Sequence, residues 1–343
     1  MLKEQTQSKT IEERFIVRPP QMSDLDDVLE LLEICDLTTI GEIEASAEML
    51  KTDWTNPKAS LEHNLRVVTT QKGRIVAYAE LWDTHDPLVH TWYWARVHPE
   101  FEGQGIGTYL INWAEKVSRS VISRAPEEAR FTMQAGMHST YQPSADLFKD
   151  NGMKLKRHFY TMKMALNEQP DAPQLPDNII IRPMRDLDEL PAIVHAIEDA
   201  FQDHWGYVDN SYEAELAFWS HIVETDPSFD RELWFLAVDG DQIAGMSLCW
   251  PKYGSDEKMG WVGTLGVRRP WRRQGLGLAL LKHSFGDLYQ RGKNKVGLGV
   301  DAGSLTGATR LYERAGMHAA RQFDVYEKEL RPGIDMMKRT IDE

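Results

Sequence analysis

A basic loop punctuated by glycines lies in the second half of the chain, where residues 265–278 read LGVRRPWRRQGLGL. An apolar run precedes this loop and a helical pattern follows it. The first N–H groups of a helix have no internal partner, and together with the helix dipole they attract an anion. Gly275 and Gly277 let the backbone approach a ligand closely, while Arg272 and Arg273 add positive charge. The segment therefore predicts a phosphate-binding loop.

Three kinds of phosphate-binding loop carry such glycines, and two of them do not fit. A nucleoside-triphosphate P-loop ends in Gly-Lys-Ser/Thr, which is absent here. A dinucleotide fingerprint requires a further glycine where Leu278 stands, and where Thr108 stands in a weaker upstream copy over residues 97–107. The type that remains is Arg/Gln-x-x-Gly-x-Gly after a strand.

The upstream copy belongs to an internal repeat of a whole domain. Residues 15–20 (FIVRPP) resemble residues 179–184 (IIIRPM), and residues 147–153 resemble residues 311–317. These anchors occur in the same order in both halves, so a duplication explains them better than chance.

The repeat predicts two domains of the same α/β (α+β) class. We expect an N-terminal domain over residues 1–166, a proline-rich linker over 167–178 and a C-terminal domain over 179–343. Each domain is expected to be a mixed, mostly antiparallel sheet flanked by helices, closed by its own last strand. The expected strands are 65–70, 75–82, 89–97 and 160–166, then 233–238, 243–250, 260–267, 295–301 and 323–330, with a short helix over 304–315.

Composition narrows the class of protein. The chain of 343 residues is 42% hydrophobic and 27% charged, with a net charge of −14 and two cysteines. We therefore expect no disulfide framework, no nucleic-acid partner, no membrane segment and a cytoplasmic location. No spacing of ligating residues suggests a metal site, and the oligomeric state stays open.

Three motifs of the second half carry a family resemblance. They are Leu265-Gly-Val267, Arg272-x-x-Gly275-x-Gly277, and residues 300–317, which hold Ala-x-x-Leu-Tyr312-x-x-x-Gly-Met. Together they resemble the GCN5-related N-acetyltransferase (GNAT) family, and the resemblance extends over both halves. It implies acetyl-CoA as co-substrate. The residues it places at the cofactor are Leu265, Gly266, Val267, Arg272, Arg273, Gln274, Gly275, Leu276, Gly277, Leu278 and Ser304.

The resemblance also implies catalytic roles. Tyr312 stands where the family has its general acid, although a core tyrosine would fit the same helical pattern. Ser304 caps the following helix or touches the cofactor. A base must keep the attacking amine neutral. The candidates for this base lie in the segment expected to border the acceptor, and they are Glu198, Asp203, His204 and Asp209. The alternative interpretation of this segment is a solvated acidic helix end.

The first half departs from this pattern at two positions. Glu102 occupies the place of Arg272, and Phe148 the place of Tyr312. A carboxylate repels a diphosphate, and a phenyl ring has no proton to donate. We therefore expect this half to be catalytically degenerate.

The predicted function is transfer of an acetyl group from acetyl-CoA to a primary amine of a small molecule, by direct attack. An activity similar to that of mycothiol synthase, a non-catalytic acyl-CoA-binding or sensing role, and protein acetylation are the alternatives.

Overall fold

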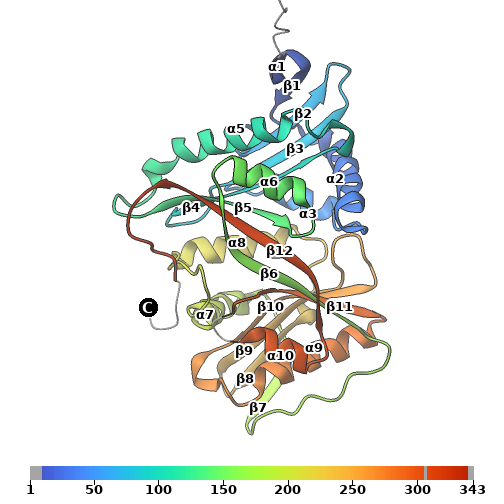
Figure 1. The fold of residues 1–343 in the computed structure, drawn as a ribbon. Coiled ribbons are helices and arrows are strands. Elements are labelled where there is room, and N and C mark those ends of the chain that lie inside the picture. The colour runs from blue at the N-terminus through green and yellow to red at the C-terminus, as the bar shows by residue number, and fades with distance from the viewer. Residues whose placement is uncertain (1–9, 305–306, 339–343) are drawn as a thin grey trace, which may run out of the picture.

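The computed structural model describes residues 10–304 and 307–338, whose regular elements alternate between strands and helices (Figure 1). The strands are β1 Phe15–Arg18, β2 Leu65–Thr70, β3 Ile75–Trp82, β4 His90–Val97, β5 Phe131–His138, β6 Lys154–Ala165, β7 Ile179–Pro183, β8 Trp234–Asp239, β9 Gln242–Trp250, β10 Met259–Val267, β11 Lys295–Asp301 and β12 His318–Arg331.

The α-helices are α1 Ile11–Arg14, α2 Leu25–Ile40, α3 Ala47–Trp54, α4 Leu61–Asn64, α5 Ile106–Ser120, α6 Gln142–Asp150, α7 Leu190–Phe201, α8 Tyr212–Thr225, α9 Leu276–Gln290 and α10 Ala308–Arg314. Short 3₁₀ turns are η1 Met22–Asp24, η2 Pro99–Phe101, η3 Ile122–Arg124, η4 Leu187–Glu189, η5 Arg231–Leu233 and η6 Arg269–Trp271.

The strands form one continuous sheet in the order β1-β2-β3-β4-β5-β12-β6-β11-β10-β9-β8-β7. Only the β4–β5 and β10–β11 pairs are parallel among these neighbours, so the expected mixed, mostly antiparallel sheet is confirmed. The expected strands over 65–70, 75–82 and 295–301 have those bounds in the structure. Of the helix expected over 304–315, residues 305–306 lie outside the described part, and α10 covers 308–314.

The two halves exchange their last strands, which the sequence analysis did not anticipate. We expected residues 323–330 to close the second half, but β12 pairs with β5 of the first half. Likewise β6, the last strand of the first half, pairs with β11 of the second half. The two exchanged strands also pair with each other, and Figure 1 shows them crossing between the upper and lower halves. Each half thereby covers an edge that would otherwise offer unpaired N–H and C=O groups.

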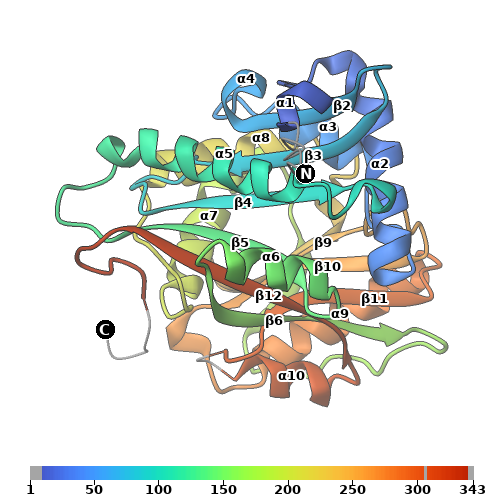
Figure 2. The ribbon, with the colours of Figure 1, turned by 45° about the horizontal axis from the view of Figure 1, so that its top comes forward.

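Helices cover both faces of this sheet (Figure 2). In the first half α5 and α6 pack on one apolar cluster, which also contains Tyr326 of β12, while α2 and α3 pack on another. In the second half α9 and α10 share a cluster with β11, and α7 and α8 enclose a separate one around Trp234. Each half of the sheet is therefore held between packed layers, which fixes the strand ends that form the site.

Candidate active site

Strands β10 and β11 separate part-way along their length. Their parallel pairing covers Met259–Val262 only, and a bulge at Gly263 follows in the pairing of β10 with β9. Residues 264–267 consequently have one backbone edge that faces away from β9 and is not paired with β11. This free edge is the place where the amides of an extended ligand could add as a further strand.

The glycine loop follows this free edge and leads into α9. Gly275 is the N-cap of α9 with φ 85°, a left-handed conformation that glycine adopts without strain. The first helical hydrogen bond runs from the Ala279 N–H to the Gly275 carbonyl, at 3.1 Å. The N–H groups of residues 276–278 precede that bond and have no partner within the helix. A Cβ built on Gly275 would meet no atom within 4 Å. The loop thus offers open space and free donors, which suit the diphosphate of a CoA molecule.

Arg272 lies differently from the expectation. Its guanidinium donates to the Val267 carbonyl at 2.9 Å, to the Ala200 carbonyl at 3.1 Å and to the Asp203 carboxylate at 2.5 Å. The side chain therefore ties the loop to the end of α7 and is not aimed at a ligand. Arg273, which has φ 64°, is exposed on the loop.

Asp203 is the buried counterpart of two arginines. Besides Arg272, the Arg269 guanidinium donates to its carboxylate at 2.5 Å and 3.1 Å. These hydrogen bonds hold the pKa of Asp203 well below its usual range. Because so weak a base accepts a proton poorly, this arrangement disfavours Asp203 as the catalytic base.

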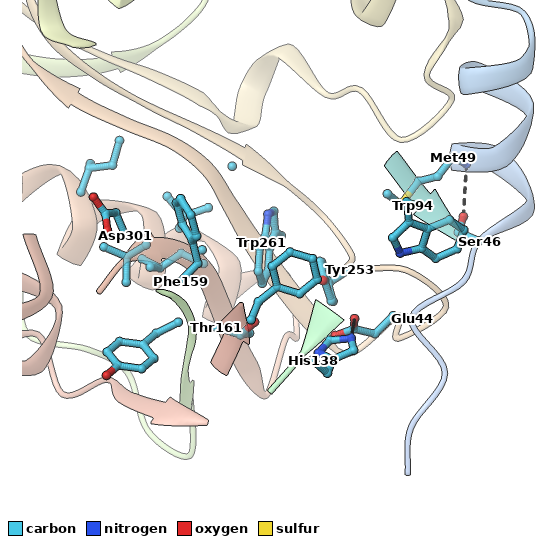
Figure 3. A pocket seen from close by; sticks show the side chains of 18 of the residues that line it. Glu44, Ser46, Met49, Trp94, His138, Phe159, Thr161, Tyr253, Trp261 and Asp301 are labelled. Atoms are coloured by element: carbon cyan, nitrogen blue, oxygen red, sulfur yellow. Dashed lines mark hydrogen bonds and ion pairs between the residues drawn. The ribbon is translucent and has the colours of Figure 1, made fainter. Parts of the chain in front are cut away.

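A cavity of about 600 Å³ lies beside the separated strands, and both halves of the chain line it (Figure 3). Asp301 and Phe159 lie at one end in this view, Trp261 and Tyr253 in the middle, and Trp94 with Ser46 at the other end. Strand β6 contributes Phe159, Tyr160 and Thr161 only because it is exchanged into the second half.

Tyr312 of α10 lines this cavity together with Leu265 and Ser304. Its side chain is 7% exposed, and burial raises the pKa of Tyr312 to about 12. The phenol is therefore protonated at neutral pH. Ser304 Oγ accepts the Ala308 N–H at 3.3 Å, so this hydroxyl supports the start of α10 at the cavity wall.

The remaining base candidates separate in space. His204 lines the cavity, and burial lowers the pKa of its imidazole, which is therefore neutral at pH 7. Glu198 does not line the cavity and instead pairs with His195 at 3.3 Å on α7. Asp209 also lies outside the cavity lining and accepts from the Tyr207 hydroxyl at 3.4 Å.

The first half contributes polar side chains that the sequence analysis did not single out. They are Asp36, Glu44, Asp53, Glu80, Arg96 and His138. Burial raises the pKa of Asp53 to about 7, assisted by the nearby Glu80 carboxylate. The sequence held no short motif that connects these residues with Tyr312, because their common location depends on how the two halves pack.

The corresponding loop of the first half keeps its glycines, but the residue in the place of Arg272 makes a different contact. The Tyr141 hydroxyl donates to Glu102, the residue in the place of Arg272. Phe148 is buried in the place of Tyr312, with its ring 5.4 Å from that of Tyr326. A second cavity of about 450 Å³ lies between this loop and the separated ends of β4 and β5. This half thus retains the outline of the site without the phenol.

Two features are absent from the part of the chain that the structure describes. None of the helices over residues 10–304 and 307–338 is both long and apolar enough to cross a membrane. In the same residues, no three or more His, Cys, Asp or Glu side chains gather in a way that could hold a metal ion.

Known proteins resemble this chain over most of its length. A GNAT-type acetyltransferase from Sphaerobacter thermophilus is 35% identical, with a TM-score of 0.78 over 95% of this chain and 99% of that one. The mycothiol acetyltransferase of Streptomyces bingchenggensis is 27% identical over 89% of this chain and 91% of its own length. A tandem GNAT protein from the clavulanic acid biosynthesis pathway shares the fold at 14% identity, with a TM-score of 0.71, over 93% of this chain and all of its own.

The sequence profile of the Acetyltransferase (GNAT) family matches the chain twice, at residues 26–138 and 194–317. The first match includes the glycine loop at residues 103–107, and the second includes the glycine loop at residues 272–278 and Tyr312. With these matches and relatives, the chain belongs to the GNAT family of acetyl-transferring enzymes as a tandem protein.

Proposed function

We propose that the second half transfers an acetyl group from acetyl-CoA to a primary amine of a small molecule, by direct attack of the amine on the thioester. One observation carries this proposal: the Tyr312 phenol and the free backbone edge at Leu265 line the same cavity. The acetyl-CoA thioester bound along this edge would then lie close to the Tyr312 phenol, next to a space large enough for an acceptor.

The donor would follow the free edge of β10 toward the loop. Its diphosphate would accept from the N–H groups of residues 276–278, and its pantetheine amides would pair with residues 264–267. The backbone N–H groups there would also stabilise the oxyanion that develops on the thioester carbonyl. The roles predicted for Gly275 and Gly277 follow from this placement, whereas Arg272 would act by holding the loop in position.

Tyr312 would protonate the departing thiolate. The same apolar surroundings that raise the pKa of the phenol also raise the pKa of a thiolate formed beside it, because both anions lose solvation. The proton therefore passes to a thiolate that is itself more basic than in water.

His204 is the base that the geometry favours. It lines the cavity in its neutral form, whereas Asp203 is held by two arginines and Glu198 lies outside the cavity lining. The imidazole would take a proton from the incoming ammonium group, directly or through one water molecule.

The names of the relatives support a second candidate, a mycothiol acetyltransferase activity. That candidate rests on the 27% identity with the Streptomyces bingchenggensis protein over most of both chains. It differs from the first only in the identity of the acceptor.

A panel of primary amines, incubated with acetyl-CoA while free thiol is followed, tests the proposal. We expect at least one amine to raise thiol release far above the hydrolysis measured without amine, and mass spectrometry to show the acetylated amine. If the protein binds CoA in calorimetry but no amine stimulates thiol release, the chain acts on another acceptor class or only binds CoA.

A further inference from the structure

Arg96 and His138 stand at the same level of β4 and β5, where the first pair of parallel strands separates. The last residues of β4 and β5 that pair are Tyr93 and Ala135, and Arg96 and His138 each lie three residues beyond. Residues at the same level of neighbouring parallel strands present their side chains to the same face. Both side chains line the 600 Å³ cavity, and both also line the 450 Å³ cavity.

Both side chains carry a buried nitrogen without a hydrogen-bond partner among the described residues: Nε of Arg96 and Nδ1 of His138. The side-chain bond that Arg96 makes goes to the carbonyl of its neighbour Ala95, at 3.1 Å, and its guanidinium lies 4.3 Å from the centroid of the Trp94 ring. Burial and nearby cations lower the pKa of His138 to about 4, so its ring is neutral at pH 7. Buried donors without acceptors are costly, and a ligand oxygen would relieve that cost.

The carboxylates around Arg96 already have other partners. Asp36 accepts the N–H groups of Glu44 and Ala45, both at 2.9 Å, and Glu44 lies 2.7 Å from the Arg321 guanidinium.

Glu80 is satisfied in the same way. Its carboxylate accepts from the Tyr78 hydroxyl at 2.7 Å and from the Trp82 indole at 2.9 Å. The guanidinium of Arg96 has no ion pair within 4.0 Å among the described residues, so its charge is available to an anion in the cavity.

The second half differs at the corresponding positions. By the alignment of the repeats, Gly266 stands in the place of Arg96, and Ala302, the neighbour of Asp301, stands in the place of His138. Asp301 is a carboxylate that the Arg157 guanidinium holds by hydrogen bonds of 2.7 and 2.8 Å. The end of the shared cavity that adjoins Tyr312 therefore carries a carboxylate that is paired with Arg157. The other end presents the two nitrogen donors of Arg96 and His138 among carboxylates that include Glu44, which lies 3.9 Å from His138 Nε2. Figure 3 shows Asp301 and His138 on opposite sides of Trp261.

We propose that Arg96 and His138 form a binding site for a carboxylate, and that the acceptor is an amine that carries this carboxylate at its other end. The inference rests on the proposed function and specifies its substrate class. The planar guanidinium binds a carboxylate through two parallel hydrogen bonds, and His138 can donate a third. The amine would then lie toward Asp301 and Tyr312.

Two series of probes test this assignment: ω-amino carboxylates from 4-aminobutyrate to 8-aminooctanoate, and the alkylamines of the same lengths. Each is assayed with acetyl-CoA and, separately, by calorimetry on the protein saturated with CoA. The variants are Arg96→Gln and Arg96→Lys. The control is Arg119→Gln, because Arg119 is an exposed arginine of α5 that pairs with Glu115.

We expect the wild-type protein to bind one length of amino carboxylate about 10- to 100-fold more tightly than the matching alkylamine, the range for a hydrogen bond to a charged group. Arg96→Gln should remove this preference by raising KM for the amino carboxylates. Arg96→Lys should retain part of it, and Arg119→Gln all of it. Equal binding of the two series to the wild-type protein overturns the assignment, even if the Arg96 variants do not fold.

The outcomes separate the two proposals. Binding of amino carboxylates that depends on Arg96, without acetylation of any amine, supports the carboxylate site and contradicts the proposed function. Acetylation of alkylamines and amino carboxylates alike supports the function and contradicts the site. If hexanoate binds through Arg96 but does not inhibit acetylation of alkylamines, the anion belongs to the 450 Å³ cavity and the assignment to the acceptor is wrong.

Discussion

Replacement of Tyr312 by phenylalanine should separate catalysis from folding in this protein. The Tyr312 hydroxyl makes no hydrogen bond to the described residues, so its removal breaks none among them. The first half already places a phenylalanine, Phe148, at the corresponding position, where it is buried at 5% exposure. We therefore expect the free energy of unfolding to change by no more than about 1 kcal/mol.

The expected effect on catalysis is much larger. A positioned general acid contributes about 10²- to 10⁴-fold to a rate, which corresponds to roughly 3–5 kcal/mol of activation free energy. Tyr312→Phe should lower kcat by that factor, while calorimetry should find the affinity for CoA within about twofold of the wild-type value.

Thiol release at saturating amine measures kcat, and thermal unfolding monitors the fold. Tyr289→Phe is the matched control, because Tyr289 packs at the edge of the same apolar cluster as Tyr312 but does not line the cavity. The reasoning is refuted if the Tyr312 variant is folded and turns over at the wild-type rate, or if Tyr289→Phe loses as much activity.

Three further predictions follow from the geometry. Gly275→Ala should weaken CoA binding in calorimetry. Gly73→Ala is the control, because Gly73 has φ 89° and is equally open, so the substitution should lower the free energy of unfolding by a similar strain of about 1–2 kcal/mol without affecting CoA binding. Equal losses of CoA affinity in the two variants would contradict the role of the loop. Because burial lowers the pKa of His204, kcat at saturating amine should stay level above pH 6.5 and fall as the pH drops below that value. His204→Gln should abolish this fall. If the variant keeps the wild-type pH profile, His204 is not the base. Residues 179–343 expressed alone should not give a cooperative unfolding transition, because β11 loses its neighbour β6 and β12 loses both of its neighbours. Cleavage of the whole chain within residues 167–178 should leave the two parts associated. A stably folded fragment would refute the role of the strand exchange.

Much of the local structure followed from the sequence. The hairpin turn at Asp239-Gly240 and the strands on either side were predictable from alternating apolar residues and a glycine, which has φ 58° in the structure. The loop before α9 and its N-cap at Gly275 were likewise predictable, because free N–H groups and glycine conformations are properties of a short segment. The family resemblance, confirmed by the matches to both halves, then implied the place of Tyr312.

The contacts of Arg272 could not be predicted from a local pattern. The position of Arg272 in the motif could be recognised from the sequence. Its guanidinium, however, donates to Asp203, which lies in a different part of the chain. A side chain as long as arginine selects its partner from whatever lies within reach, and that choice depends on the packing of α7 against the loop. The same ion pairs decided which of the base candidates keeps a usable proton affinity.

Residue types at short spacing were enough to reveal the duplication, the class of each half and the position of the glycine loop before α9. The exchange of β6 and β12 became visible in the folded molecule alone, as did the cavity that Arg96 and His138 of one half share with Tyr312 of the other. The physical reason is that strand pairing satisfies the same backbone groups whichever half supplies the strand. The choice between the two arrangements therefore rests on side-chain packing across the whole molecule, which no local pattern records.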